Sequence, residues 1–445
     1  MTDRKEITPV TDRILDKLIL FALIAQIVFI FGMNLFRADT IIDFDSSSAY
    51  LHEMEMGSQG KIFPSEYSYQ ATMDLDSAAM MSALLYYFTG DIFLSRGIAN
   101  NLMVILFMLG YWRMLFVGGG FFAVRALVPL LLISLIPDLD KGNRFRNYAF
   151  RLILLLFFVF LGGLSSGAYL LLCAVFPFLL WEFVRAFLKG DYSQVRSKRT
   201  GIAILAVLAS VAGLILQKAV GFSSTADSKR ILTSSKWAEA VLSSFAGLFE
   251  LFGGLTTHEQ VKLFSAEAIG TAVDFAVTFV LLTAILYTVV TCVKKKEISD
   301  MKGYILSLML VNALMCSFLD LKYGVTVFES RYHIVPMLPS FFLVVMMMED
   351  LSKKDLKKVQ LYTLHCLITG LFLASMLYGD AQWVYAKTAL ESDKLVALDR
   401  VIEEEGISTA FIVGEDSKEL GRKIRVYGKN THYSDNLCEQ IYAEE

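Results

Sequence analysis

Metal-binding cysteine patterns, histidine clusters and basic stripes are all missing from this sequence, and each absence excludes a class of protein. The five cysteines are scattered, without a Cys-x-x-Cys or other metal-ligand spacing, which argues against disulfides and against a structural zinc site. His52, His258 and His365 have no ligand-like spacing to each other, so we expect structural roles for them. Because no basic stripe is present, we expect no nucleic-acid partner.

Charge is also scarce: 19% of the 445 residues are charged, 55% are hydrophobic, and the mean hydropathy is +0.54. Soluble domains average roughly 25% charged and 45–50% apolar residues, so this composition is shifted toward lipid. Apolar runs near twenty residues recur, and each can cross a hydrocarbon core of about 30 Å as a helix. The sequence therefore predicts an all-α polytopic membrane protein in contact with membrane lipids.

The predicted transmembrane domain covers residues 1–380 and has about 10 to 11 spans. The candidate spans are residues 18–36, 77–92, 98–117, 121–136, 149–164, 169–188, 202–220, 271–293, 303–321, 333–348 and 361–378. The first run is too long for a signal-peptide core and has no small-x-small cleavage site after it, so we interpret it as a retained span. Segment 77–92 is short, and a helix lying on the outer surface is the alternative for it.

Connections rich in lysine and arginine predict the orientation of these spans. They lie at residues 141–146, 189–199, 294–302 and 353–358. Because such loops stay in the cytoplasm, the chain is predicted to begin there too. The loops 38–76 and 222–270, the segment 322–331 and the tail 381–445 then fall on the extracytoplasmic face, which we expect to be that of a bacterial plasma membrane.

Two of the outer segments are predicted to be structured. Apolar residues in 237–252 recur at steps of three and four, which is typical of a helix that lies in the membrane interface or packs on the bundle. The tail is more polar: 392–405 is predicted to be helical, with short strands at 409–413 and 423–426. We expect residues 381–445 to form a small α/β unit.

Carboxylates crowd into the first outer loop, at the membrane boundary. Asp43 and Asp45 follow the first span, and Asp74 and Asp76 form a second pair. A carboxylate in this place is costly unless water, a cation or a partner stabilises it. A desolvated Asp45 suits a general base that accepts a proton from a sugar hydroxyl. In an extended segment Asp43 and Asp45 point the same way and can share a divalent cation, whereas the simplest alternative is a solvated acidic loop.

A second polar cluster, residues 328–339, stands just before a span. Its Arg331 has the fork geometry that suits a phosphate, and Tyr332 and His333 add donors. A snorkelling arginine beside an interfacial tyrosine is the alternative. The candidate substrate-binding residues are Asp74, Asp76, Arg96, Arg331, Tyr332 and His333.

These stretches, taken in order over residues 10–345, resemble GT-C-fold glycosyltransferases such as protein O-mannosyltransferases and aminoarabinose transferases. The resembling residues are Asp45, Ala49, Tyr50, Glu53, Met54, 60–64, 83–91, Arg96, Asn100, Asn101, 163–177 and 330–336. Segment 83–91 matches the family's juxtamembrane helix before the second span, and 330–336 is similar to its late Arg-Tyr-x-x-x-Pro motif. Two departures stand out: Ser46 replaces an acid that many relatives carry, and 118–147 is shorter than the family's usual hairpin.

The resemblance implies a GT-C-like bundle that transfers a sugar from a polyprenyl-phosphate donor on the extracytoplasmic face. The acceptor is a hydroxyl of a glycan, lipid or protein. Asp45 would take the acceptor proton, and Arg331 would steady the departing phosphate. No certain cofactor is implied, because many sites of this class need no metal. The alternatives are a transporter or flippase, which usually places ionisable groups near the midplane, and a non-catalytic scaffold of an envelope complex.

Overall fold

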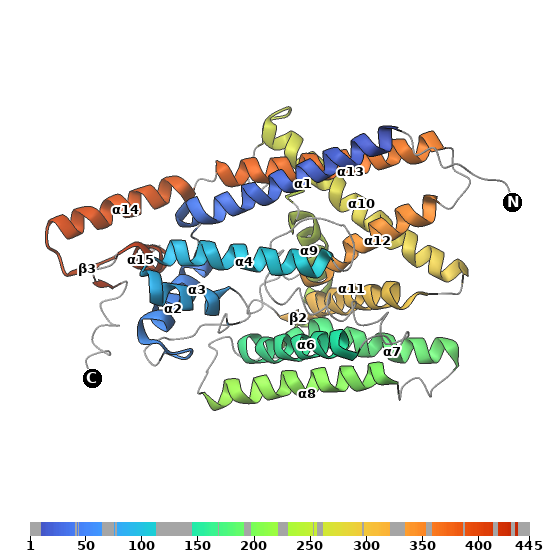
Figure 1. Ribbon diagram of the computed structural model, residues 1–445, viewed down its shortest axis with the longest axis horizontal. Coiled ribbons are helices and arrows are strands. Elements are labelled where there is room, and N and C mark those ends of the chain that lie inside the picture. The colour runs from blue at the N-terminus through green and yellow to red at the C-terminus, as the bar shows by residue number, and fades with distance from the viewer. Residues whose placement is uncertain are drawn as a thin grey trace.

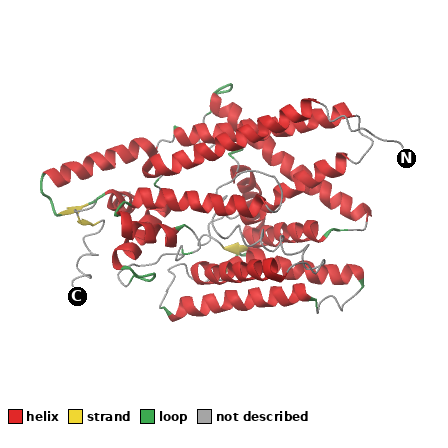
Figure 2. Ribbon diagram, viewed as in Figure 1, coloured by secondary structure: helices red, strands yellow, loops and turns green. Residues whose placement is uncertain are grey.

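The computed structural model describes residues 10–40, 42, 44–64, 75, 78–112, 145–167, 169–190, 197–220, 230–251, 253–255, 261–295, 298–320, 334–352, 358–385, 388–412, 417–428 and 432–434. Helices dominate this part of the chain, and the strands form two short pairs (Figure 2). The α-helices are α1 (Val10–Phe36), α2 (Phe44–Gln59), α3 (Ala79–Thr89), α4 (Ile92–Trp112), α6 (Phe145–Ser166), α7 (Phe176–Lys189), α8 (Lys198–Ala219), α9 (Trp237–Leu251), α10 (Ala266–Lys295), α11 (Asp300–Phe318), α12 (Ile334–Ser352), α13 (Lys358–Val384), α14 (Thr388–Glu404) and α15 (Ser417–Tyr427). The shorter elements are η1 (Ala38–Thr40), η3 (Leu171–Val175), η5 (Ser234–Lys236), β1 (Arg230–Ile231), β2 (Leu319–Asp320), β3 (Thr409–Phe411) and β4 (His432–Ser434).

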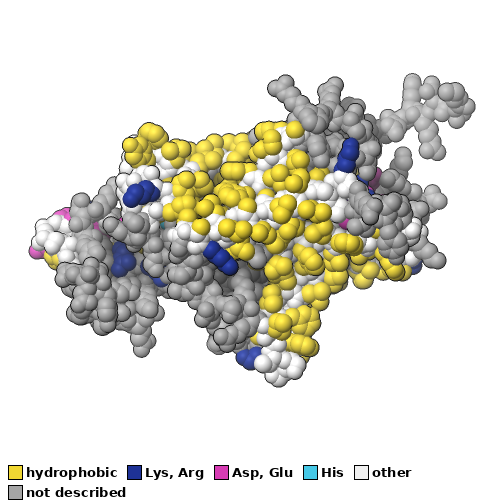
Figure 3. Space-filling view, turned by 90° about the horizontal axis from the view of Figure 1, so that it is seen from below, with side chains coloured by type: hydrophobic (Ala, Val, Ile, Leu, Met, Phe, Trp, Pro, Cys, Tyr) yellow, Lys and Arg dark blue, Asp and Glu magenta, His cyan; other side chains and the backbone are white. Residues whose placement is uncertain are grey.

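Six helices in the described part of the chain are long and apolar enough to cross a membrane. They are Lys17–Phe36, Leu171–Lys189, Lys198–Ala219, Ala266–Lys295, Asp300–Phe318 and Val359–Val384. Apolar side chains also cover much of the described surface seen from below, with only a few Lys and Arg side chains among them (Figure 3). The chain is therefore an all-α polytopic membrane protein, as the sequence predicts. The candidate span 121–136 lies outside the described residues.

The short span expected at residues 77–92 is wrong, because the helix there is too short to cross the membrane. Its helix, α3, has 11 residues and ends at Gly90, which adopts the left-handed conformation (φ 63°) common just after helices. At 1.5 Å per residue α3 is only about 16 Å long, roughly half of a hydrocarbon core. It packs closely on α2 instead. A Cβ at Gly57 of α2 would lie only 2.8 Å from the carbonyl oxygen of Ala83 in α3, so the two helices touch at this glycine.

The helix ends that carry the described basic residues of the Lys- and Arg-rich connections lie together at one end of the bundle, on the right in Figure 1; the residues are Lys189, Lys198, Arg199, Lys294, Lys295 and Lys302. Ion pairs join these helix ends. Asp300, at the start of α11, accepts from Arg199 of α8 at 2.7 Å and from Arg185 of α7 at 3.3 Å. Lys302 is paired with Asp350 of α12 at 2.8 Å. The helices α2, α3, α14 and α15 lie at the opposite end, which we call the α2 end (Figure 1).

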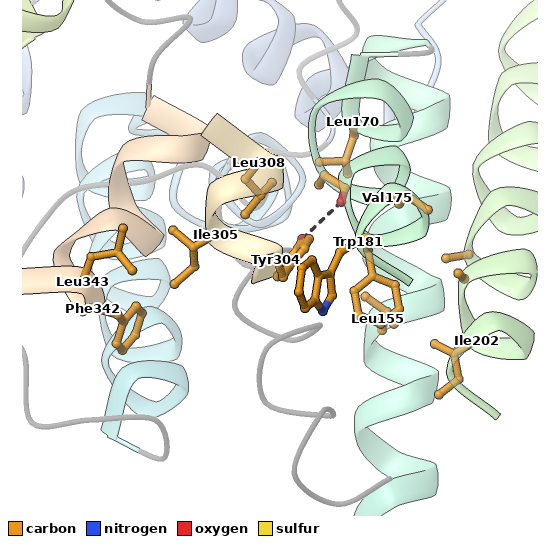
Figure 4. Packing of buried hydrophobic residues seen from close by; sticks show 14 of the residues in the cluster. Leu155, Leu170, Val175, Trp181, Ile202, Tyr304, Ile305, Leu308, Phe342 and Leu343 are labelled. Atoms are coloured by element: carbon orange, nitrogen blue, oxygen red, sulfur yellow. Dashed lines mark hydrogen bonds between the residues drawn. The ribbon is translucent and has the colours of Figure 1, made fainter. Parts of the chain in front are cut away.

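The main core lies among α6, α7, α8, α10, α11 and α12 (Figure 4). A five-residue π-helix, η3, leads into α7, and its wider turn changes the hydrogen-bond pattern of the backbone. Two side chains of α11 use carbonyl groups of this segment: Tyr304 donates to Ala174 at 3.1 Å, and Asn312 donates to Cys173 at 3.1 Å. The π-helix thus adds hydrogen bonds to the direct packing of α7 on α11, where the ring centroids of Phe178 and Tyr304 lie 5.4 Å apart.

Helices α6 and α8 run parallel and touch backbone to backbone. A Cβ at Gly213 would lie 2.2 Å from the carbonyl oxygen of Phe160, and one at Gly163 would lie 2.3 Å from that of Ser210. Small residues allow such close approach in membrane helices, where tight packing drives association. Because α6 is parallel to α8, it also begins at the Lys- and Arg-rich end.

Helix α9 confirms the helix expected at 237–252. It packs on the bundle through Ala240, Ser244 and Gly247, while Phe249 stacks on Phe275 of α10 with ring centroids 4.7 Å apart. Leu242 remains 70% exposed on its other face. Packing on the bundle is therefore confirmed, whereas a position in the membrane interface, which the exposed apolar face would suit, stays a prediction.

The tail forms a small α/β unit, made of α14, β3, α15 and β4, which we call the C-terminal unit. Helix α14 and strand β3 agree with the sequence prediction, but the strand predicted at 423–426 was wrong because these residues lie in α15. The buried residues Gly421, Ile424 and Tyr427 recur every three positions, which is a helical period. The second strand is β4, parallel to β3, and parallel strands need such a crossover helix.

Candidate functional site

The site is built where α1 ends and α4 begins, at the α2 end. The two helices touch at Gly97, where a Cβ would lie 2.2 Å from the carbonyl oxygen of Asn34. Asn34 also donates from Nδ2 to Oδ1 of Asn101 at 2.8 Å, a buried bond between the same helices. The first turn of α4 is capped by Asp91, whose Oδ1 accepts from the backbone N–H of Phe93 at 3.0 Å. These contacts give α2 a rigid base.

A buried ion pair fixes α2 to this base. The Glu53 side chain is fully buried, and its Oε1 accepts from Nη1 of Arg96 on α4. The Arg96 side chain is 17% exposed, and its guanidinium lies over the Tyr50 ring, with Cζ 5.5 Å from the ring centroid. Among the described residues, Oε2 of Glu53 has no hydrogen-bond partner. Since a buried charge is costly without a partner, removing either Glu53 or Arg96 would leave the other with an uncompensated charge.

Tyr50 connects α2 to the turn that precedes it. Its hydroxyl donates to the carbonyl oxygen of Ala38 in η1 at 3.2 Å, and its ring lies 5.7 Å from that of Phe93. Burial raises the pKa of Tyr50 to about 12, although the positive charge of Arg96 opposes that shift. The hydroxyl therefore stays protonated and remains a donor at neutral pH.

The C-terminal unit also reaches α2. Nη1 of Arg422 donates to the hydroxyl oxygen of Ser48 at 3.1 Å, and the Tyr427 hydroxyl donates to the carbonyl oxygen of Asp39 at 2.5 Å. The Tyr427 ring lies 5.3 Å from that of Phe93. A shared apolar cluster joins the two parts of the chain; its buried members are Ile42, Tyr50, Ile92, Leu395, Ile424, Val426 and Tyr427.

His52 is the other buried titratable group of α2. It is 1% exposed, and burial lowers its pKa to about 4. The imidazole is therefore neutral at physiological pH. Seven residues separate His52 from Asp45, so both lie on one face of α2, two turns apart.

Asp45 stands in the first turn of α2, which begins at Phe44. The backbone of Asp45 is therefore helical, so the extended segment in which Asp43 and Asp45 would point the same way is not present at Asp45. The side chain of Asp45 lies outside the described part, as do six other predicted residues: Asp43, Asp74, Asp76, Arg331, Tyr332 and His333. Their approach to Asp45, and any shared cation, stay predictions. The described residues contain no group of three or more His, Cys, Asp and Glu side chains placed to hold a metal ion.

Arg96 is the predicted site residue whose side-chain contacts are described, and those contacts give it a structural partner, Glu53. Sequence reasoning missed this pair because the two residues are 43 positions apart. The available signal was weak: a carboxylate and an arginine, each in a segment at a membrane boundary. It also missed the contacts made by Arg422 and Tyr427, for which no short-range pattern exists.

Other buried carboxylates lie elsewhere in the chain, and one of them, Asp274, bears on function. Asp274 of α10 is 4% exposed, and its Oδ1 accepts from the hydroxyl of Ser375 on α13 at 2.5 Å. An ionisable group within a span is costly and often marks a pathway for ions or substrates. Asp274 belongs to a different group of helices from the contacts around α2.

Comparison of the chain with protein-family models, with curated proteins and with solved structures finds no match.

Proposed function

We propose that this integral membrane protein is a glycosyltransferase that uses a polyprenyl-phosphate-linked sugar at the α2 end. The observation that carries the proposal is the fixed position of α2. Its first turn holds Asp45 directly after span α1, and the Glu53–Arg96 pair anchors the helix two turns further on. A general base needs such support, because its carboxylate must stay within hydrogen-bond reach of the proton that it accepts.

In the proposed reaction, Asp45 accepts the proton of an acceptor hydroxyl while the hydroxyl oxygen attacks the anomeric carbon of the sugar. The bond between that carbon and the phosphate oxygen breaks, and the electron pair leaves with the polyprenyl phosphate. Arg331, with Tyr332 and His333, would stabilise the negative charge that grows on the leaving phosphate. No step is assigned to a metal ion.

The short helix α3 supports the same proposal. The GT-C resemblance implies a juxtamembrane helix that enters the second span, and α3 is a short helix followed directly by α4. The clustering of lysine and arginine at the opposite end favours an extracytoplasmic position for α2, because such connections stay in the cytoplasm.

A transporter or flippase is the second candidate, and Asp274 is the observation that favours it. Its carboxylate is buried within span α10, where ionisable groups often serve translocation. Transport would require Asp274, whereas glycosyl transfer would require Asp45. The two functions therefore predict different inactive variants.

The experiment uses the full chain in liposomes, with a panel of undecaprenyl-phosphate sugars and a membrane extract of the source cell as acceptor. Every sugar gives the same by-product, undecaprenyl phosphate, which mass spectrometry detects. Asp45→Asn keeps the shape but cannot accept the proton, so product formation should fall about 10²- to 10⁴-fold. The matched control is Asp91→Asn, because an asparagine still caps α4. If the unaltered protein releases no undecaprenyl phosphate but moves the lipid-linked sugar across the liposome membrane, and Asp274→Asn but not Asp45→Asn abolishes that movement, the result would support the transporter instead.

A further inference from the structure

The turn η1, which joins span α1 to α2, is held by hydroxyl groups from two separate elements, α2 and α15. Tyr50 donates to the carbonyl oxygen of Ala38, and Tyr427 donates to that of Asp39, the next residue. One hydroxyl comes from α2 itself and the other from α15, 388 residues after the carbonyl that it binds. Two neighbouring carbonyl groups of one turn are thus fixed by separate elements, which restricts the path of the chain into α2.

The rings of the same tyrosines are packed through Phe93. The centroid of the Phe93 ring lies 5.7 Å from that of Tyr50 and 5.3 Å from that of Tyr427. Phe93 belongs to the first turn of α4, beside Ile92, which is 4% exposed. Aromatic pairs at such distances attract each other beyond the effect of their buried area. The C-terminal unit is therefore packed against the base of the site.

A third contact reaches α2 close to Asp45. Arg422 donates to the hydroxyl oxygen of Ser48, and Ser48 is three residues after Asp45, on the adjacent turn of the same helix. Arg422 lies on α15, one and a half turns before Tyr427. One helix of the tail thus contacts both the turn before Asp45 and the turn after it.

The unit that carries α15 has its own internal support. Strands β3 and β4 are parallel, with Ala410 opposite Tyr433, and α15 is the crossover between them. Ile424 on the inner face of α15 is 1% exposed, and Leu395 on α14 is 6% exposed. Because both belong to the cluster shared with α2, the tail is seated by buried apolar side chains as well as by hydrogen bonds.

We propose that the C-terminal unit positions the first turn of α2, with Tyr427 and Arg422 as positioning residues for the carboxylate that the turn carries. The tail is then a component of the site and not an independent appendage. That the positioned carboxylate is a catalytic base rests on the proposed function. The positioning itself does not, so the two can fail separately.

The test is hydrogen–deuterium exchange on the full chain in detergent, comparing Tyr427→Phe with the unaltered protein. This variant keeps the ring and its packing but removes the hydroxyl. Loss of one hydrogen bond should speed exchange in residues 38–50 by about two- to tenfold. Residues 51–59 of α2 are the internal reference, because the Glu53–Arg96 pair holds them and their exchange should not change. Tyr385→Phe is the matched control, since Tyr385 is 84% exposed.

Arg422 is tested in the same way with two variants. Arg422→Gln should speed exchange around Ser48, whereas Arg422→Lys keeps a charged donor and should stay close to the unaltered protein. Arg400→Gln on the exposed side of α14 is the control. Unchanged exchange over residues 38–50 in both Tyr427→Phe and Arg422→Gln would overturn the positioning role.

The catalytic consequence has its own readout. If Asp45 is the base, Tyr427→Phe should lower kcat about two- to tenfold and leave KM for the undecaprenyl-phosphate sugar unchanged, because the variant displaces the base but not the donor. Faster exchange together with unchanged kcat would refute a role of the tail in catalysis. Faster exchange in a protein that transfers no sugar would support the positioning and refute the proposed function alone.

Discussion

Removing Glu53 should destabilise the protein far more than its single ion pair suggests, because Arg96 would be left behind with a buried charge. The Glu53 side chain is fully buried, and the Arg96 side chain is 17% exposed. Breaking a buried pair by removing one partner typically costs about 3–5 kcal/mol. Arg96 keeps its cation–π contact with Tyr50 and some access to water, so we expect the lower end of that range, about 3 kcal/mol.

Three variants separate the charge from the packing. Glu53→Ala should lose about 3 kcal/mol, whereas Glu53→Gln should lose about 1–2 kcal/mol because an amide oxygen can still accept from Arg96. The double variant Glu53→Met with Arg96→Met removes both charges and keeps the volume, so its stability should lie within about 1 kcal/mol of the unaltered protein. The double variant is the decisive comparison, because a loss from poor packing alone would persist in it.

Thermal unfolding in detergent, followed with a thiol-reactive dye, suits this protein. Cys173, Cys292 and Cys316 are buried, so the dye reaches them only when the helices separate. The reasoning is wrong if Glu53→Ala unfolds at the same temperature as the unaltered protein. It is equally wrong if the double variant is less stable than either single one, since that would mean that the pair itself is the stabilising element.

Two further predictions concern packing and pH. Gly213→Ala should cost about 1–3 kcal/mol, because its Cβ would lie 2.2 Å from the carbonyl oxygen of Phe160 and would push α6 and α8 apart. The control is Gly201→Ala on the same helix, where a Cβ would have nothing within 4 Å, so this variant should be neutral or stabilising by up to about 1 kcal/mol. If the two variants change the unfolding temperature equally, the close contact at Gly213 is contradicted. Because burial lowers the pKa of His52 to about 4, the unfolded chain, with a pKa of 6.5, binds this proton first as the pH falls. The contribution of His52 to stability is thus complete above about pH 6.5 and decreases toward pH 4, by about 3 kcal/mol in all. His52→Gln should remove that part of the pH dependence of the unfolding free energy. If the slope of the unfolding free energy between pH 7.5 and pH 4.5 is the same in the variant, His52 is not its source.

The long helices could be predicted from the sequence because lipid imposes a simple rule on them. Every backbone group within the hydrocarbon must be paired inside its own segment, so an apolar run of sufficient length becomes a helix. The six long apolar helices follow this rule, and so does α9, whose apolar residues recur with a helical period. Segment 77–92 is predicted to be a span because the orientation of the Lys- and Arg-rich loops requires a crossing there. The 11 residues of α3, which ends at Gly90, are too few for that crossing.

Outside the membrane the same rule gives no guidance. Residues 423–426 alternate between polar and apolar, as a short strand does, and only the longer spacing of Gly421, Ile424 and Tyr427 indicates the helix that forms. The contacts that build the site are harder still, because they join residues far apart in the chain. Neither Glu53 with Arg96 nor Arg422 with Ser48 follows a local pattern; packing between α2, α4 and α15 brings them together.

The neighbours of α1 impose an order on biogenesis. Gln26 of α1 donates to Asp380 of α13 at 2.8 Å, and Phe29 meets Trp383 edge to face with ring centroids 6.0 Å apart. Span α1 therefore has a partner that is made 354 residues later. At about 5–20 residues per second, the polar side chain of Gln26 waits roughly 20–70 s in the bilayer for Asp380. During that interval the insertion machinery, or α4 alone, must cover the polar side chain of α1. A ribosome that stalls before α13 would release a chain in which α1 lacks its contacts with α13.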